Sequence, residues 1–285
     1  MKYVYVQEII SCHRLCPFDG MYIPTQTAVD RQRTARMAEA ACVPTIAPSS
    51  NFAGFCPCHK FTALHKKTLQ ETGVVVVDNF FEQPRVDGVR KEVEELPLTS
   101  TVQPKTTRSD RIAWVHENQH GFKSIPSAVK CLKGIGHCFE DVLGKLDAPS
   151  RCMAAVYEGK PEEEQNGYRV HLDNCPPKDD DLYWLWRSSR EQSDRKLTSI
   201  LYLNDSGWED DVKGSGNGGN LRCYLGCDKG DDSGATAKGV QDIAPVGGRL
   251  VVFLSQNIPH EVLPTAEKRK RVALSCWHLD GGAGE

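Results

Sequence analysis

Short runs of β-branched, aromatic and other apolar residues fill much of the chain between residues 151 and 279, and this pattern constrains the fold most. Most of the runs begin or end beside Gly, Asp, Asn or Pro, which favour turns. They read RCMAAVYEG, YRVHLDN, KLTSILYLN, NLRCYLG, GGRLVVFLS, HEVLP and RVALSCWHL, and an earlier run reads TGVVVVDNFF. Many short strands separated by turns predict a barrel or a sandwich.

Two stretches ahead of most of these strands carry apolar residues at helical spacing. Residues 84–98 place Val86, Val89, Val93 and Leu96 on one face. Residues 127–146 do the same with Val129, Leu132, Ile135, Phe139, Val142 and Leu146. Such spacing is typical of amphipathic helices that cover a sheet. We therefore expect a mainly β fold with supporting helices packed on one sheet.

Composition excludes some classes of partner. The chain has 285 residues and a net charge of −3, so it lacks the basic excess of a nucleic-acid binder. It has no apolar run of the roughly 18 residues that a membrane span needs, and its start lacks the apolar core of a secretory signal. We expect no nucleic-acid or membrane partner, a cytoplasmic or nuclear location, and a monomer. In such a compartment the 12 cysteines are expected to be thiols more than disulfides.

The N-terminal part differs from the rest in texture. Residues 1–68 combine clustered cysteines with scattered prolines and a single helical pattern, RQRTARMAEAAC, so we expect a Cys-rich appendage at 1–68 and a catalytic domain at 69–285. The appendage offers a zinc-ligand set, although the spacings C-x3-C and C-x-C-H are not those of a strong zinc motif. That set is Cys12, Cys16, Cys56, Cys58 and His59. Ordinary thiols are the alternative.

The tripeptide HLD occurs twice, and the residues after each copy decide which one can form a metal site. In a strand, residues i and i+2 point to the same face, so His171 and Asp173 can share a barrel mouth. Two His with one carboxylate form the facial triad of non-haem Fe(II) oxygenases, and His260, in NIPHEVLP, is a candidate for the third ligand. The second copy, His278 and Asp280, is followed only by GGAGE. We expect it to end the last strand, with a partly exposed His278.

A cation follows the third ligand at a short distance. Arg271 lies 11 residues after His260 and begins a strand. An Arg fork is the natural partner of a carboxylate in a pocket, and the Tyr202 hydroxyl can contact the same carboxylate.

At these residues the sequence resembles the 2-oxoglutarate/Fe(II)-dependent prolyl hydroxylases, in particular the oxygen-sensing branch that modifies the hypoxia-inducible factor. Collagen-type members usually carry Lys where this chain has Arg271. The resemblance covers about residues 72–281 and includes RSDRIAWVHE, MAAVYEG, GYRVHLDN, SILYLN, GGNLR, NIPHEVLP and RVALSCW. It implies a double-stranded β-helix (jelly-roll) fold. It also implies hydroxylation of a prolyl residue in an intracellular protein to 4-hydroxyproline, with succinate and CO2 as products.

The resemblance also implies a set of catalytic and binding residues. Fe(II) would be bound by His171, Asp173 and His260, and the distal carboxylate of 2-oxoglutarate by Arg271 and Tyr202. Tyr157 and Leu221 would line the same pocket, Trp277 would lie near the metal, and Asp110 would pair with Arg195 to hold a substrate-covering loop. O2 is the second co-substrate, and ascorbate is an expected accessory.

Two segments depart from the family pattern and leave the substrate open. Residues 174–196 and the loop CDKGDDSGATAKG are longer than in the animal members. Loops at a barrel mouth set substrate choice. A small-molecule hydroxylase on the same scaffold is the main alternative, and a non-catalytic β-helix binding module is the other.

Overall fold

The computed structural model describes residues 57–100, 108–149, 151–161, 167–174, 194–208 and 218–281. These residues belong to one compact unit, Pro57–Glu285. The expected zinc ligands Cys12, Cys16 and Cys56, the side chain of Cys58, the expected helix at 31–42 and most of the 174–196 insertion lie outside the described residues.

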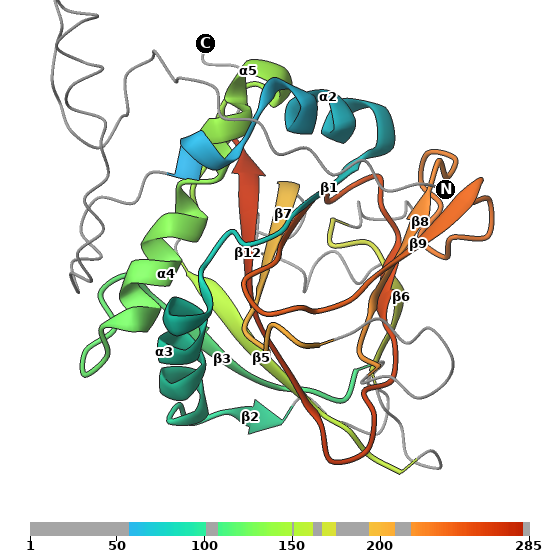
Figure 1. Ribbon diagram of the computed structural model, residues 1–285. Helices are drawn as coiled ribbons and strands as arrows, with labels where there is room; N and C mark the ends of the chain where they lie inside the picture. The colour runs from blue at the N-terminus through green and yellow to red at the C-terminus, as the bar shows by residue number, and fades with distance from the viewer. Residues whose placement is uncertain are drawn as a thin grey trace, which may run out of the picture. The chain divides into compact units, whose positions relative to one another are not determined.

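The larger of two antiparallel sheets lies next to the helices (Figure 1). Its strand order is β1-β10-β7-β12-β5-β3-β2, and β4 pairs with β12. The bounds are β1 Val74–Val77, β2 Thr99–Ser100, β3 Arg111–Val115, β4 Leu146–Asp147, β5 Cys152–Glu158, β7 Arg195–Tyr202, β10 Leu250–Leu254 and β12 Lys270–Asp280. The long strand β12 lies between β5 and β7, where one face turns to the helices and the other to the smaller sheet.

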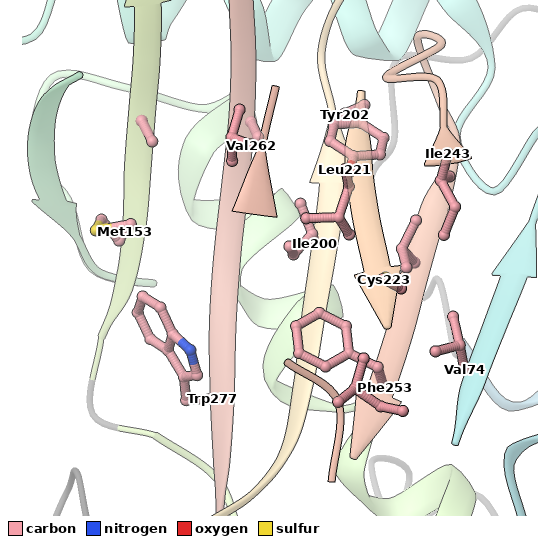
Figure 2. Close-up of a cluster of buried hydrophobic side chains, with 14 of the residues drawn as sticks. Val74, Met153, Ile200, Tyr202, Leu221, Cys223, Ile243, Phe253, Val262 and Trp277 are labelled. Carbon is pink, nitrogen blue, oxygen red and sulfur yellow. The ribbon is translucent and has the colours of Figure 1, made fainter. Parts of the chain in front are cut away.

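The smaller sheet has the order β6-β11-β8-β9. Its strands are β6 Tyr168–His171, β8 Leu221–Leu225, β9 Gly239–Ile243 and β11 His260–Val262. Buried side chains from both sheets meet in one apolar cluster, which Figure 2 shows in close-up. The strands at the expected runs and the placement of the helices confirm the mainly β fold with supporting helices.

The helices gather on the outer side of the large sheet (Figure 1). They are η1 Pro57–Lys60, α2 Ala63–Thr72, α3 Gln83–Glu94, α4 Ser124–Lys133, η2 Gly136–Phe139 and α5 Glu140–Leu143. The Glu92 carboxylate of α3 accepts hydrogen bonds from the backbone N–H groups of Lys123, Ser124 and Ile125, so one helix caps the start of the next. No helix in the described parts of the chain is long and apolar enough to cross a membrane.

The expected domain boundary at residue 68 falls within α2. Phe61 packs edge-on against Phe139 at 4.8 Å, and Lys66 pairs with Asp141 at 2.7 Å, so residues just before the boundary contact the part of the chain after it. For residues 1–56 the division stays a prediction.

The single helix expected at 127–146 is wrong, because the chain leaves α4 at Gly134 and continues as η2 and α5. After the break the chain passes close to β12. A Cβ atom at Gly136 would lie 2.9 Å from Nδ1 of His278 in β12, so only glycine allows this close approach. The short segment therefore follows the surface of the sheet.

Candidate metal and co-substrate site

Three side chains with metal-ligand chemistry converge where β6 and β11 lie side by side. His171 lies directly opposite His260 in the β6–β11 register, and Asp173 follows two residues beyond β6. Asp173 Oδ1 is 3.7 Å from His171 Nε2, and Oδ2 is 3.9 Å from His260 Nε2. One ligand atom from each residue lies within 4.8 Å of the others, so the structure brings the expected ligands together. We call His171, Asp173 and His260 the ligand triad.

Backbone carbonyl groups fix the tautomer of both imidazoles. Nδ1 of His171 is 2.8 Å from the Arg169 carbonyl oxygen, and Nδ1 of His260 is 3.0 Å from that of Ile258. Because a carbonyl only accepts, both Nδ1 atoms carry the proton, and both Nε2 lone pairs are free to bind a metal.

The charges of the triad also suit a cation. Burial, with a further contribution from His260, lowers the pKa of His171 to about 3, so its imidazole is neutral at pH 7. Burial alone would raise the pKa of Asp173, but the two histidines, Arg195 and the Thr198 hydroxyl lower it to about 2. A neutral imidazole and an ionised carboxylate are the forms that bind metal ions.

Three residues that the sequence did not indicate support the triad. Thr198 Oγ1 on β7 donates to Asp173 Oδ2 at 2.8 Å, and it lies 2.8 Å from the Ser255 hydroxyl. The Tyr168 ring stacks on His171 with 3.7 Å between centroids. These contacts orient the ligands, as outer-shell groups do around protein metal sites.

The expected carboxylate pocket is built around a buried cation. Arg271 is 3% exposed, and its Nε donates to the Gly219 carbonyl oxygen at 2.8 Å. Its Nη2 lies 3.4 Å from the Tyr202 hydroxyl. The guanidinium carbon is 5.3 Å from the ring centre of Tyr157 and 5.0 Å from that of Tyr202. No carboxylate of the described chain pairs with Arg271. Because a buried charge needs a counter-charge, this arrangement indicates an anion site.

The remaining pocket residues lie in the same apolar cluster. Leu221 is fully buried there, and the same cluster includes Tyr157, Tyr202 and Trp277. The Trp277 indole is 9% exposed, and its N–H has no hydrogen-bond partner within the described residues. The structure thus groups the residues expected around the co-substrate, while their individual roles stay predictions.

Asp110 and Arg195 each contact residues other than the partner expected from the resemblance, which is a direct pair between the two. The buried Asp110 carboxylate accepts hydrogen bonds from both Nε and Nη2 of Arg108. Arg195 lies 4.1 Å over the Trp277 ring and donates to the Asp173 carbonyl oxygen at 3.3 Å. A direct pair between Asp110 and Arg195 stays a prediction.

The second HLD copy lies away from the triad. β12 ends at Asp280 as expected, but the partly exposed His278 is wrong, because this side chain is 0% exposed. It lies on the helix side of the sheet beside Gly136, with Nε2 3.3 Å from the Ser199 hydroxyl. Burial, followed by His137, lowers its pKa to about 3.

A cavity of about 640 Å³ opens beside His171 and Asp173 of the triad. It is lined by Tyr168, Arg169, Val170, His171, Leu172, Asp173, Arg195, Asp232, Ser233 and Glu261. Asp232 and Ser233 belong to the long loop CDKGDDSGATAKG, which Asp231 organises by accepting hydrogen bonds from the backbone of Ser233, Gly234 and Thr236. This extended loop therefore borders the mouth, as the sequence predicts.

Residues 152–279 match the model of the 2OG-Fe(II) oxygenase superfamily. These residues have the sequence pattern of a 2OG-Fe(II) oxygenase domain. The ligand triad fits Fe(II), since two imidazoles and one carboxylate are the donor set that non-haem iron oxygenases use. The buried Arg271, which has no carboxylate partner among the described residues, likewise fits the distal carboxylate of 2-oxoglutarate, and O2 is the second co-substrate of the family.

Sequence comparison with a known protein supports this assignment. Over 236 residues the chain is 29% identical to a hypoxia-inducible factor prolyl hydroxylase of Caenorhabditis elegans. This alignment covers 75% of this chain but 27% of that protein. It therefore spans about a quarter of that relative's length.

Solved structures with the same fold include two prolyl hydroxylases. A Pseudomonas putida prolyl-4-hydroxylase is 26% identical with a TM-score of 0.56, covering 77% of this chain and 99% of that one. A Trichoplax adhaerens prolyl hydroxylase, solved with a hypoxia inducible factor peptide, is 22% identical with a TM-score of 0.58, covering 90% of this chain and 94% of that one. The expected double-stranded β-helix fold is confirmed.

Proposed function

We propose that this chain is a 2-oxoglutarate-dependent prolyl hydroxylase that converts a prolyl residue of a protein to 4-hydroxyproline, with succinate and CO2 as products. The observation that carries the proposal is the buried Arg271, which has no carboxylate partner within the described residues and lies beside Tyr202 in the barrel that holds the triad. The similarity to the C. elegans and P. putida hydroxylases supports proline as the target.

Each group of residues has a role in this proposal. The triad holds Fe(II), which supplies the oxidising chemistry when it is bound with O2 and 2-oxoglutarate. Arg271 and Tyr202 bind the distal carboxylate of 2-oxoglutarate, while Tyr157 and Leu221 exclude water around its carbon chain. Trp277, whose indole N–H has no hydrogen-bond partner in the described parts of the chain, borders the site. A dry pocket and fixed orientation let the chain direct oxidation to one C–H bond.

A protein substrate fits the mouth better than a small molecule does. The cavity is lined by charged groups of both signs, including Arg169, Asp232 and Glu261, and a polar, open rim suits an extended peptide backbone with its own polar groups. We propose an intracellular substrate, a role in oxygen sensing, a cytoplasmic or nuclear location, a monomeric enzyme and ascorbate as an accessory reductant.

Mass spectrometry of a panel of proline-containing peptides tests the proposal. The peptides are incubated with the chain, Fe(II), 2-oxoglutarate and O2, and fragment spectra locate any added oxygen atom. We expect hydroxylation of a proline with one succinate formed per hydroxyl group. The Asp173→Ala variant is the control and should give neither product. Steady turnover of a small molecule without hydroxyproline on any peptide would favour the small-molecule hydroxylase, and peptide binding without succinate formation would favour the binding module.

A further inference from the structure

Two buried cysteines face each other across neighbouring strands of the large sheet. Cys152 is the first residue of β5, and Cys276 lies in β12. The antiparallel register places Ser275 opposite Met153. Cys276 follows Ser275 in β12, and Cys152 precedes Met153 in β5, so the two cysteines are the next opposed pair. Their sulfur atoms are 2.9 Å apart, and both residues are 0% exposed. The pair lies outside the oxygenase site, because the side chains that enter the site cluster are those of Met153 and Trp277.

The backbone already has the geometry that a disulfide needs. Opposed residues of antiparallel strands have Cα atoms about 4.5–5.5 Å apart. Disulfides join Cα atoms about 4.4–6.8 Å apart, with an S–S bond of about 2.05 Å. Side-chain rotation with little backbone movement therefore closes the gap. We propose that Cys152 and Cys276 are a redox modification site that forms an intramolecular disulfide and joins β5 to β12.

The oxidant that this reaction needs is a small peroxide such as H2O2. One thiolate attacks the peroxide and becomes a sulfenic acid, with release of water. The second thiol displaces hydroxide from that sulfur, and a second water leaves. Two thiols thus lose two electrons and two protons, and one H2O2 becomes two waters.

Burial sets how fast this modification is. Burial, together with the hydrogen bond to Cys152, raises the pKa of the Cys276 thiol well above its usual value. Thiolate is scarce at neutral pH, so the pair reacts slowly, and faster as pH rises. The partly exposed Cys227, whose thiol donates to the Tyr224 carbonyl oxygen at 3.5 Å, is easier to reach, so it serves as an internal comparison.

The disulfide would join two strands that carry the co-substrate pocket. Tyr157 lies on β5, while Arg271 and Trp277 lie on β12. The bond spans 124 residues of sequence, and cross-linking so long a loop restricts the unfolded chain strongly. Oxidation should therefore raise the thermal midpoint by several degrees. This inference holds whether or not the chain hydroxylates proline.

Peptide mapping of the full chain tests the proposal without any variant. The chain is treated with H2O2 in a chelator that removes iron, then alkylated and digested with trypsin without reductant. Cleavage after Arg151, Arg169 and Arg271 isolates peptides 152–169 and 272–285, each with a single cysteine. We expect these two peptides joined as the major cross-link among the buried cysteines, more of it at pH 8.5 than at pH 7, and its loss on reduction.

Matched variants separate the pair from general oxidation. Cys152→Ala should abolish both the cross-link and the oxidant-induced rise in thermal midpoint. Cys138→Ala, at another buried thiol, whose Sγ lies 3.6 Å from the Gly134 carbonyl oxygen, should keep both. Free alkylation of Cys152 and Cys276 after prolonged oxidation at pH 8.5, or their linkage to other cysteines instead, would overturn the proposal.

Discussion

Arg271→Lys tests whether the buried cation holds 2-oxoglutarate. In the wild type, Nε of Arg271 donates to the Gly219 carbonyl oxygen, and Nη2 lies near the Tyr202 hydroxyl in the pocket. Gly219 has a φ of +71°, and a Cβ atom there would lie 3.1 Å from Arg271 Cδ, so the arginine stem fills the space beside it. An ammonium keeps the positive charge but cannot reproduce two parallel hydrogen bonds to a carboxylate.

The expected loss follows from one charged hydrogen bond. Such a bond contributes about 1.5–3 kcal/mol, which corresponds to a rise of roughly 10- to 150-fold in the KM for 2-oxoglutarate. The assay measures succinate formation over a range of 2-oxoglutarate concentrations. A second readout is the thermal shift that 2-oxoglutarate causes under nitrogen, which should shrink in the variant.

The neighbouring basic residues provide the control. Lys268, Arg269 and Lys270 are exposed, so Lys270→Ala should leave the KM unchanged. If Arg271→Lys kept the wild-type KM and thermal shift, another cation would hold the co-substrate, and the inference from an unpaired buried charge would be wrong.

Four other outcomes are expected. Alanine at any member of the ligand triad should abolish bound iron and succinate formation, whereas His278→Ala should keep both; iron that stays bound without His171 would exclude this site. Thr198→Val should weaken iron binding by about 10- to 100-fold in a metal titration, because Asp173 loses an orienting hydrogen bond. Asp110→Asn should reduce peptide hydroxylation far more than peptide-independent 2-oxoglutarate decay, and equal losses would contradict a substrate-loop role. His278 binds a proton in the unfolded state below pH 6.5 but in the folded state only near pH 3, so stability should fall by about 2 kcal/mol between pH 7 and pH 5. His278→Asn should flatten that slope in urea unfolding curves, and an unchanged slope would assign the acid sensitivity elsewhere.

Strand alternation and the resemblance to the prolyl hydroxylases together predicted the ligand triad. His171 and Asp173 share a face because they are two residues apart, and the strand that begins at His260 carries the third ligand. Arg271 was also predicted, although the run EKRKR has no local signal that separates a buried guanidinium from three exposed neighbours. Which of these four basic residues is buried depends on where along β12 both faces of the strand become covered.

Contacts between distant elements could not be predicted from local pattern. Thr198 lies within β7 and Ser255 directly follows β10, and neither has a local sequence signal that places Thr198 beside Asp173 and Ser255 beside Thr198. β9 was missed because GVQDI is a polar edge strand, with Val240 55% exposed. The burial of His278 follows from alternation along β12 only when the helices are known to cover that face.

The two sheets contribute different halves of the site. The ligand triad comes from β6, its C-terminal end and β11 in the small sheet, whereas Arg271, Tyr202, Tyr157 and Trp277 come from the large one. The hydrogen bond from Thr198 to Asp173 is a direct polar link between these halves. Iron would bind on the small sheet and the distal carboxylate of 2-oxoglutarate on the large one, so the distance between the two sites depends on how the sheets pack, and binding of both would stabilise the closed barrel. The apolar cluster between the sheets therefore positions the site as much as the ligands do, and a cavity made there would weaken co-substrate binding without removing any residue that contacts it.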